Sequence, residues 1–271
     1  SSPAEALPRA HAGRPERLVG VVCVVAAVTL FAVQDAAAKW LAETQSLVQI
    51  VWARYLFALP VLLLGTPRRA WTTVPRVARP GLQAARALLP VLASFAVVLG
   101  LVYLPLAEVT VLTFASPLLV AALSAPVLGE RVAPRDWLGI LIGFVGIVIV
   151  VRPGSDAFAW AALFPLACAA FFALFQLPPR LVGRTAPPAA TLAWTLLIGL
   201  GVTSLLLSLD WRPVHAASWA LMALTGLCFG GAQYLLVRAY LRAPAALLAP
   251  FTYVQIVPAT LLGLLLFGAA P

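Results

Sequence analysis

The chain has 271 residues, of which 63% are hydrophobic and only 10% are charged. A soluble domain carries about 25% charged residues, so this composition excludes a soluble globular protein and predicts an all-α integral membrane protein. The formal net charge of +9 comes from arginines spread along the chain rather than from one contiguous basic face, so we expect no nucleic-acid partner.

Apolar runs long enough to cross a membrane follow one another along the chain. After a disordered cytoplasmic tail over residues 1–17, we predict a helical bundle of nine spans, over residues 18–38, 47–66, 87–104, 106–128, 137–151, 158–178, 189–209, 216–237 and 244–268. Most of the 18 basic residues fall in alternate connecting segments, on the side where the chain begins. The positive-inside rule therefore predicts a cytoplasmic N-terminus.

Two proline-interrupted stretches resemble each other. Residues 103–131 read YLPLAEVTVLTFASPLLVAALSAPVLGER, and residues 240–271 read YLRAPAALLAPFTYVQIVPATLLGLLLFGAAP. Broken spans at matching positions of two halves point to the substrate site of membrane carriers. We therefore predict two inverted repeats, over residues 18–152 (spans 1–5) and 158–271 (spans 6–9, with a tenth span absent).

Charged residues inside spans are candidate functional residues, because a charge in the membrane is costly. Arg54 either grips a carboxylate or carbonyl of the substrate or is a buried packing partner of Asp35 or Glu108. Asp35 and Lys39 have the spacing of a helical ion pair. Alternatively, Asp35 recognises a substrate ammonium or takes up a coupling proton, and Lys39 reaches outward. Glu108 is either a solvated loop acid or joins the other three in closing the outer end of a cavity.

The inner end of the predicted cavity carries the inverted counterpart of this cluster, which is less charged: Gln176, Arg180 and Leu196.

Near the middle of the membrane, the candidates for substrate contact or helix breaking are Thr113, Ser116 and Pro117 on the fourth span, Gln233 on the eighth, and Tyr253, Gln255 and Pro258 on the ninth. Proline frees helix carbonyls that can face a cavity, or simply kinks a helix, and Thr and Ser often bond to their own helix. The longer Tyr253 and Gln255 are the better candidates for substrate contact, and we expect Pro117 and Pro258 to meet near the midplane. Gly226 and Gly230, four residues apart, suit close helix packing.

An enzyme would need a constellation that the sequence lacks. His11 and His215 lie outside the spans, and the sequence contains no HExxH, GxSxG or GxxxxGK[ST] motif. We expect no enzymatic activity, no metal and no cofactor, while proton coupling stays open.

Several short motifs carry a family resemblance. The Gly-Glu-Arg of residues 129–131, the Asp-Trp-Leu-Gly of residues 136–139 and the segment AYLRAPA at 239–245 resemble the EamA-type drug/metabolite transporter superfamily. Residues 31–39 (FAVQDAAAK) and 52–55 (WARY) resemble the branch that contains bacterial S-adenosylmethionine and riboflavin carriers. The resemblance implies ten spans in two EamA repeats, with both termini cytoplasmic, in a bacterial inner membrane.

The resemblance implies a secondary transporter that moves a small polar or zwitterionic metabolite by alternating access. An amino acid or derivative, S-adenosylmethionine and a riboflavin-like vitamin are the substrates that it suggests. Two alternatives stay open: a broad-specificity exporter of drugs and amphipathic cations, and a non-transporting membrane subunit or truncated paralogue. The expected partners are a small-molecule substrate and the lipid bilayer, and the oligomeric state, monomer or dimer, is left open.

Overall fold

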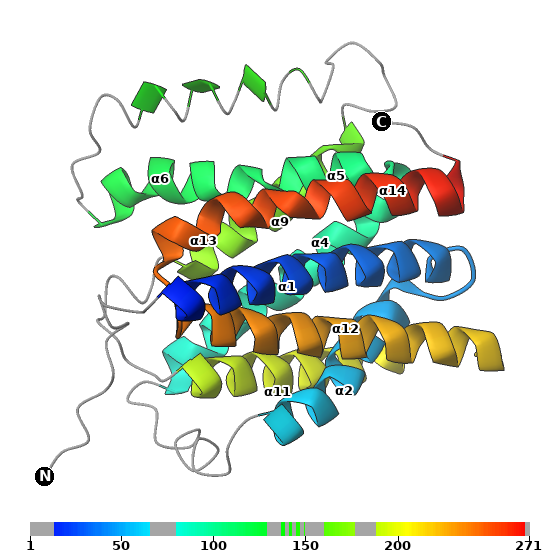
Figure 1. Ribbon diagram of the computed structural model, residues 1–271. Helices are drawn as coiled ribbons and strands as arrows, with labels where there is room; N and C mark the ends of the chain where they lie inside the picture. The colour runs from blue at the N-terminus through cyan, green and yellow to red at the C-terminus, as the bar shows by residue number, and fades with distance from the viewer. Residues whose placement is uncertain are drawn as a thin grey trace, which may run out of the picture.

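The fold is a bundle of helices, seen here in a computed structural model (Figure 1). The structure describes residues 14–65, 80–128, 137–138, 141–142, 145–146, 149, 160–176 and 188–268. The helices are α1 (Arg14–Leu41), α2 (Leu47–Gly65), α4 (Pro80–Tyr103), α5 (Leu106–Thr113), α6 (Ala115–Leu128), α9 (Leu163–Gln176), α11 (Pro188–Leu207), α12 (Ala216–Tyr240), α13 (Ala245–Thr252), the 3-10 turn η2 (Tyr253–Gln255) and α14 (Ile256–Phe267).

These helices confirm a helical membrane protein. Within the described ranges, six helices are long and apolar enough to cross a membrane, and two shorter apolar helices accompany them. Every predicted span except the fifth coincides with helices; the fifth, 137–151, lies largely outside the described residues, so the count of nine stays a prediction. Large apolar side chains point outward, such as Leu64, Leu205 and Leu265, as expected of a surface that contacts lipid.

The first helix begins earlier than predicted. Residues 14–17, assigned to the disordered tail from the sequence, form the first turn of α1. Proline at the start of a helix and an acid in its first turn both favour this beginning, and α1 has Pro15 and Glu16 there. Residues 1–13 of the predicted tail lie outside the described residues.

Contacts between helix ends give each helix a direction. Lys39 near the end of α1 bonds to the carbonyl of Leu104, just after α4, and Trp40 packs on Phe267 at the end of α14. Gly20 near the start of α1 lies against Ala243, just after α12. Thus α1, α4 and α14 finish at one end of the bundle, which we call the Lys39 end, and α12 finishes at the other, the Arg17 end.

The remaining helices follow the same scheme. Tyr103 at the end of α4 packs on Trp160, just before α9, so α9 begins at the Lys39 end. Trp52 near the start of α2 donates a hydrogen bond to Ser204 near the end of α11, so α2 begins and α11 ends there. The helices at equivalent places in the two predicted halves, α1 and α9, α2 and α11, α4 and α12, therefore run in opposite directions.

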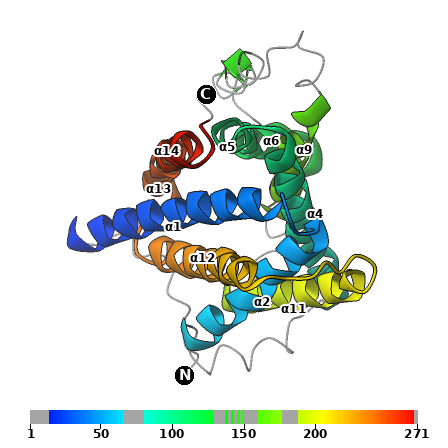
Figure 2. The ribbon, with the colours of Figure 1, turned by 90° about the vertical axis from the view of Figure 1, so that its right-hand side faces the viewer.

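The contacts between helices also correspond in the two predicted halves. α1 packs along α12 and α4 packs along α9, while α12 also packs on α2 and α11 on α4. If each helix is replaced by its counterpart in the other predicted half, the α1–α12 pair becomes the α9–α4 pair. In the same way, the α12–α2 pair becomes the α4–α11 pair. Figure 2 shows α1 lying between α12 and the α13–α14 pair, where it contacts both.

Two glycines set the distance between α2 and α12. A Cβ atom on Gly226 would lie 2.4 Å from the Cβ of Phe57 and 2.7 Å from the carbonyl oxygen of Ala53. One turn later, a Cβ atom on Gly230 would lie 3.0 Å from the backbone of Ala58. Because glycine lacks this atom, the two helices come into backbone contact, which confirms the close packing predicted from the four-residue spacing.

The fourth and ninth predicted spans are both interrupted about one turn before a proline. α5 gives way to α6 at Phe114, ahead of Pro117, and α13 gives way to α14 through η2, ahead of Pro258. Proline has no N–H group and its ring crowds the carbonyl one turn earlier, which accounts for both breaks. The breaks meet through the rings of Phe114 and Tyr253, whose centroids lie 4.9 Å apart. Pro117 is exposed, and the expected meeting of Pro117 and Pro258 stays a prediction.

Candidate functional site

The centre of the candidate site is a buried ion pair between α1 and α2. Arg54 Nη2 lies 3.4 Å from Asp35 Oδ1, and the two residues are only 2% and 8% exposed. The guanidinium carbon of Arg54 also lies 5.9 Å from the centre of the Phe229 ring on α12. An unpaired charge inside a membrane is costly, so each group neutralises the other. The sequence left Asp35 and Glu108 open as partners of Arg54, and Asp35 is the partner in the structure.

Gln34 completes what we call the Asp35 cluster: Gln34, Asp35 and Arg54. The amide Nε2 of Gln34 donates to the same carboxylate oxygen as Arg54, at 3.3 Å. The Nε of Arg54 and the Oε1 of Gln34 are buried and have no hydrogen-bond partner among the described residues. Leaving such an atom unpaired costs about 1–3 kcal/mol. The cluster therefore offers one unsatisfied donor and one unsatisfied acceptor.

Aromatic side chains pack beside the Asp35 cluster, where Phe229 lies over Arg54. The ring of Phe229 lies 6.4 Å from the ring of Phe31 and 5.8 Å from that of Tyr55. The fully buried Tyr55 shares a hydrogen bond with Ser94 of α4 at 3.2 Å. The residues of the cluster are buried, and polar interactions are stronger in such surroundings.

Lys39 does not pair with Asp35, contrary to one reading of the sequence. Its Nζ donates to the carbonyl oxygens of Leu101 and Leu104 at 2.6 and 2.8 Å, and lies 5.6 Å from the centre of the Phe267 ring. The last carbonyls of a helix lack partners within it and attract a cation. Lys39 therefore closes the end of α4, and Asp35 remains available to Arg54.

Glu108 lies at the start of α5, just after the end of α4. It is half-buried in the first turn of α5, where the helix dipole favours an acid. At 1.5 Å per residue, Arg54 lies about 10 Å along α2 from its start at the Lys39 end. All four predicted charges thus lie toward the Lys39 end: Asp35 and Arg54 form a buried pair, and Lys39 and Glu108 lie at helix termini.

The mid-membrane candidates lie at or beside the two helix breaks, except Gln233, which lies within α12. Thr113 donates to the carbonyl of Thr110 at 2.8 Å, so it bonds to its own helix, the alternative considered for it. Ser116 is 8% exposed, and its Oγ has no partner among the described residues. Tyr253 is 48% exposed. Gln255 and Gln233 are half-buried.

The predicted inner counterpart of the charged cluster consists of Gln176, Arg180 and Leu196. Leu196 is fully buried on α11. Gln176 ends α9, but its side chain lies outside the described part of the chain, as does all of Arg180.

Two polar residues that were not predicted from the sequence, Ser46 and Gln49, form hydrogen bonds between segments at the Lys39 end. Ser46 Oγ accepts from the backbone N–H of Gln49, and Gln49 Oε1 accepts from that of Ser46, both at 3.2 Å. This is a capping box, which the Ser-x-x-Gln spacing signals. Gln49 also donates to the carbonyl of Arg212 at 2.8 Å and accepts from its N–H at 3.1 Å. The start of α2 is thereby fixed to the connection between α11 and α12.

This chain is similar in sequence to known transporters. The sequence pattern of the EamA-like transporter family matches residues 18–152. A riboflavin transporter of Rhizobium johnstonii is 30% identical over 261 residues, covering 94% of this chain and 85% of the relative. A riboflavin transporter of Brucella anthropi is 27% identical over 256 residues, covering 92% and 90%.

More distant relatives extend the likeness. An S-adenosylmethionine uptake transporter of Rickettsia felis is 21% identical over 254 residues, covering 94% of this chain and 86% of the relative. A protein solved by crystallography has the same fold, with a TM-score of 0.63, 20% identity and coverage of 95% of this chain and 90% of that one. The identity and coverage of the first relative, together with the family match, establish that this multi-pass membrane protein belongs to the EamA-like transporter family.

Proposed function

We propose that this chain transports a riboflavin-like metabolite, one that carries a cyclic amide. We also propose that the Asp35 cluster recognises this amide through hydrogen bonds. The observation that carries the proposal is the pair of buried, unpaired atoms, the Nε of Arg54 and the Oε1 of Gln34. Both side chains are held by the same oxygen of Asp35, so a donor and an acceptor are presented from one place. The names of the relatives with 30% and 27% identity support the same substrate class.

The hydrogen-bonding pattern favours an amide over a zwitterion. Asp35 and Arg54 satisfy each other's charge, so neither is left to bind a free ammonium or carboxylate. The remaining N–H donor and carbonyl acceptor complement the C=O and N–H groups of a lactam. The ring system of riboflavin has such an edge, an N–H between two carbonyls, and is flat and aromatic, which suits the rings of Phe31 and Phe229. A site built for these hydrogen bonds discriminates strongly against a ligand that lacks them.

Alternating access is the transport mechanism that we propose. Helices at equivalent places in the two predicted halves run in opposite directions, as expected of the inverted repeats on which many carriers are built. In this conformation the Asp35 cluster is covered, and Gln49 and Lys39 join helices at the Lys39 end. We propose that a substrate reaches the cluster when this end opens, and that the Arg17 end faces the cytoplasm, as the distribution of basic residues favours.

An exporter of amphipathic cations is a weaker candidate. Such a substrate would need an acid free to receive its charge, and Asp35 is already bound to Arg54 and Gln34.

Uptake into proteoliposomes tests the proposed function. We expect labelled riboflavin to accumulate, and unlabelled S-adenosylmethionine in tenfold excess to leave that uptake unchanged. Arg54→Lys keeps the charge but lacks the Nε–H group, so it should lower riboflavin uptake at least tenfold. The exposed Arg238→Lys on α12 is the matched control and should transport like the wild type. Uptake of S-adenosylmethionine without riboflavin uptake would overturn the substrate, and absence of uptake of any metabolite would favour a non-transporting subunit.

A further inference from the structure

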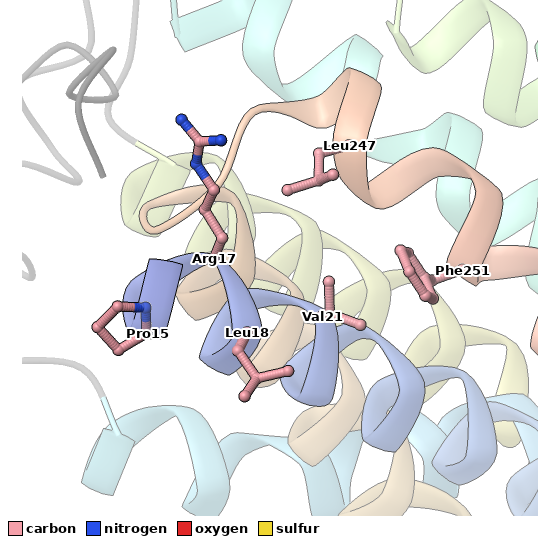
Figure 3. A pocket seen from close by; sticks show the side chains of 6 residues that line it. All are labelled: Pro15, Arg17, Leu18, Val21, Leu247 and Phe251. Carbon is pink, nitrogen blue, oxygen red and sulfur yellow. The ribbon is translucent and has the colours of Figure 1, made fainter. Parts of the chain in front are cut away.

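A groove lies at the Arg17 end, far along the helices from the Asp35 cluster. It has a volume of about 570 Å³ and is lined by Pro15, Arg17, Leu18, Val21, Leu247 and Phe251. Figure 3 shows that the first four residues come from the start of α1 and the last two from α13, with Arg17 and Val21 projecting toward the α13 side. The groove thus separates a continuous helix from the first half of the broken ninth span.

The lining is apolar except for one cation. Leu18 is 64% exposed and Leu247 is 37% exposed, so the walls of the groove are open to the surroundings of the protein. Around a membrane-spanning helix those surroundings are lipid, and an open apolar groove between two helices accommodates an acyl chain. Arg17 is exposed and has no ion pair among the described residues.

Further arginines lie at this end of the bundle, together with one acid in the first turn of α1, Glu16. Gly20 on α1 lies 3.5 Å, measured from the Cβ position, from the carbonyl oxygen of Ala239 on α12. This contact brings the end of α12, with Arg238 and Arg242, close to the start of α1. Arginines at the end of a span attract anionic lipid headgroups. The Arg17 end therefore combines a cavity for a chain with positive charge for a headgroup.

We propose that the groove binds an anionic phospholipid, with one acyl chain between Val21 and Phe251 and its phosphate on Arg17. The occupant is a lipid of the surrounding membrane and is distinct from the transported substrate, so the proposal does not depend on the proposed function. Bound there, the lipid would contact α13, the helix that precedes the break in the ninth span.

Native mass spectrometry of the detergent-purified chain tests this. Phosphatidylglycerol and phosphatidylcholine with identical acyl chains are titrated separately, and we expect the first to bind at least tenfold more tightly. Arg17→Gln should reduce that preference to less than threefold, because the phosphate loses its partner. Val21→Trp fills the groove and should weaken binding of both lipids.

Two matched variants serve as controls. Arg212→Gln removes an exposed arginine at the Lys39 end, and Leu261→Trp enlarges an exposed side chain on α14; both should bind phosphatidylglycerol like the wild type. Equal affinity of the wild-type chain for the two lipids would overturn the proposal, because the groove would then be an unselective site for acyl chains. An unchanged preference in Arg17→Gln, which alters only an exposed side chain, would overturn it as well.

Discussion

Two regions of the bundle are built in opposite ways. Around the Asp35 cluster, α1, α2 and α12 are continuous helices; α1 and α2 share a buried ion pair, and α2 and α12 approach closely at Gly226. Where the fourth and ninth spans meet, the helices are interrupted and touch through neutral rings, those of Phe114 and Tyr253. Recognition chemistry needs fixed positions, whereas hinges absorb changes in backbone angles. We propose that the continuous helices recognise the substrate and that the broken helices move during transport.

The largest effect on stability is expected from breaking the ion pair. Arg54→Met leaves the Asp35 carboxylate buried without its cation, which destabilises a protein by about 3–5 kcal/mol. Thermal melting in detergent, without substrate, measures the loss. The double variant Arg54→Met with Asp35→Leu removes both charges and should recover most of the lost stability, without recovering riboflavin uptake. A wild-type melting temperature for the single variant would contradict a structural role for the pair.

A smaller loss is expected where α2 meets α12. Gly226→Ala places a Cβ atom against Phe57 and Ala53, and overpacking of this kind costs about 1–3 kcal/mol. Gly201→Ala on α11 is the matched control, because nothing lies within 4 Å of its Cβ position, and alanine favours a helix by about 0.5–1 kcal/mol. The melting temperatures of the two variants should therefore shift in opposite directions, and a shared direction would argue against a close α2–α12 contact.

A third, smaller effect concerns the Lys39 end. Lys39→Met removes the donor that bonds to the final carbonyls of α4, a contribution of about 1 kcal/mol for a cation at a helix end. The melting temperature should fall modestly. Arg212→Met, which removes a cation whose side chain is 52% exposed, should have no measurable effect. Equal shifts for the two variants would show that Lys39 acts only through the overall charge.

A similarly small effect on stability is expected at the helix breaks. Phe114→Ala and Tyr253→Ala, alone and combined, form a double-mutant cycle whose coupling should be about 0.5–1.5 kcal/mol, as for other aromatic pairs. We expect the same variants to change the rate of riboflavin uptake while leaving riboflavin binding within about threefold of the wild type. A loss of binding without a change in rate would place these residues in the recognition region instead.

The sequence predicted much of the fold because membrane insertion leaves a strong signal. Long apolar runs are needed to satisfy backbone hydrogen bonds inside the membrane, and all but the fifth predicted span coincide with described helices. The breaks in the fourth and ninth spans could also be anticipated, since a proline inside a helix removes a hydrogen bond and often kinks or breaks the helix, although Pro60 and Pro90 lie within the unbroken α2 and α4. Which residues meet there could not be anticipated, because the contact between Phe114 and Tyr253 depends on how the helices rotate about their axes.

The site was predicted less completely. Arg54 and Asp35 stood out because charge is rare in a span, but Gln34, beside Asp35, is neutral and gave no comparable signal. The i, i+4 spacing favoured a pair between Asp35 and Lys39, and the structure instead directs Lys39 to the end of α4, whose free carbonyls sequence reasoning did not consider. The capping box at Ser46 and Gln49 has a recognisable spacing and could have been found.

The most direct test of the account is equilibrium binding of two flavins, measured by the change in their fluorescence on titration with the purified chain. Riboflavin should bind, and riboflavin methylated at the N–H between its two carbonyls should bind at least tenfold more weakly, because it can no longer donate to Gln34 Oε1. In Gln34→Leu both ligands should bind weakly and alike, whereas Gln45→Leu, which alters another buried glutamine with an unpaired Oε1, should retain the difference. Equal affinity of the wild-type chain for the two flavins would contradict recognition of a cyclic amide by the Asp35 cluster.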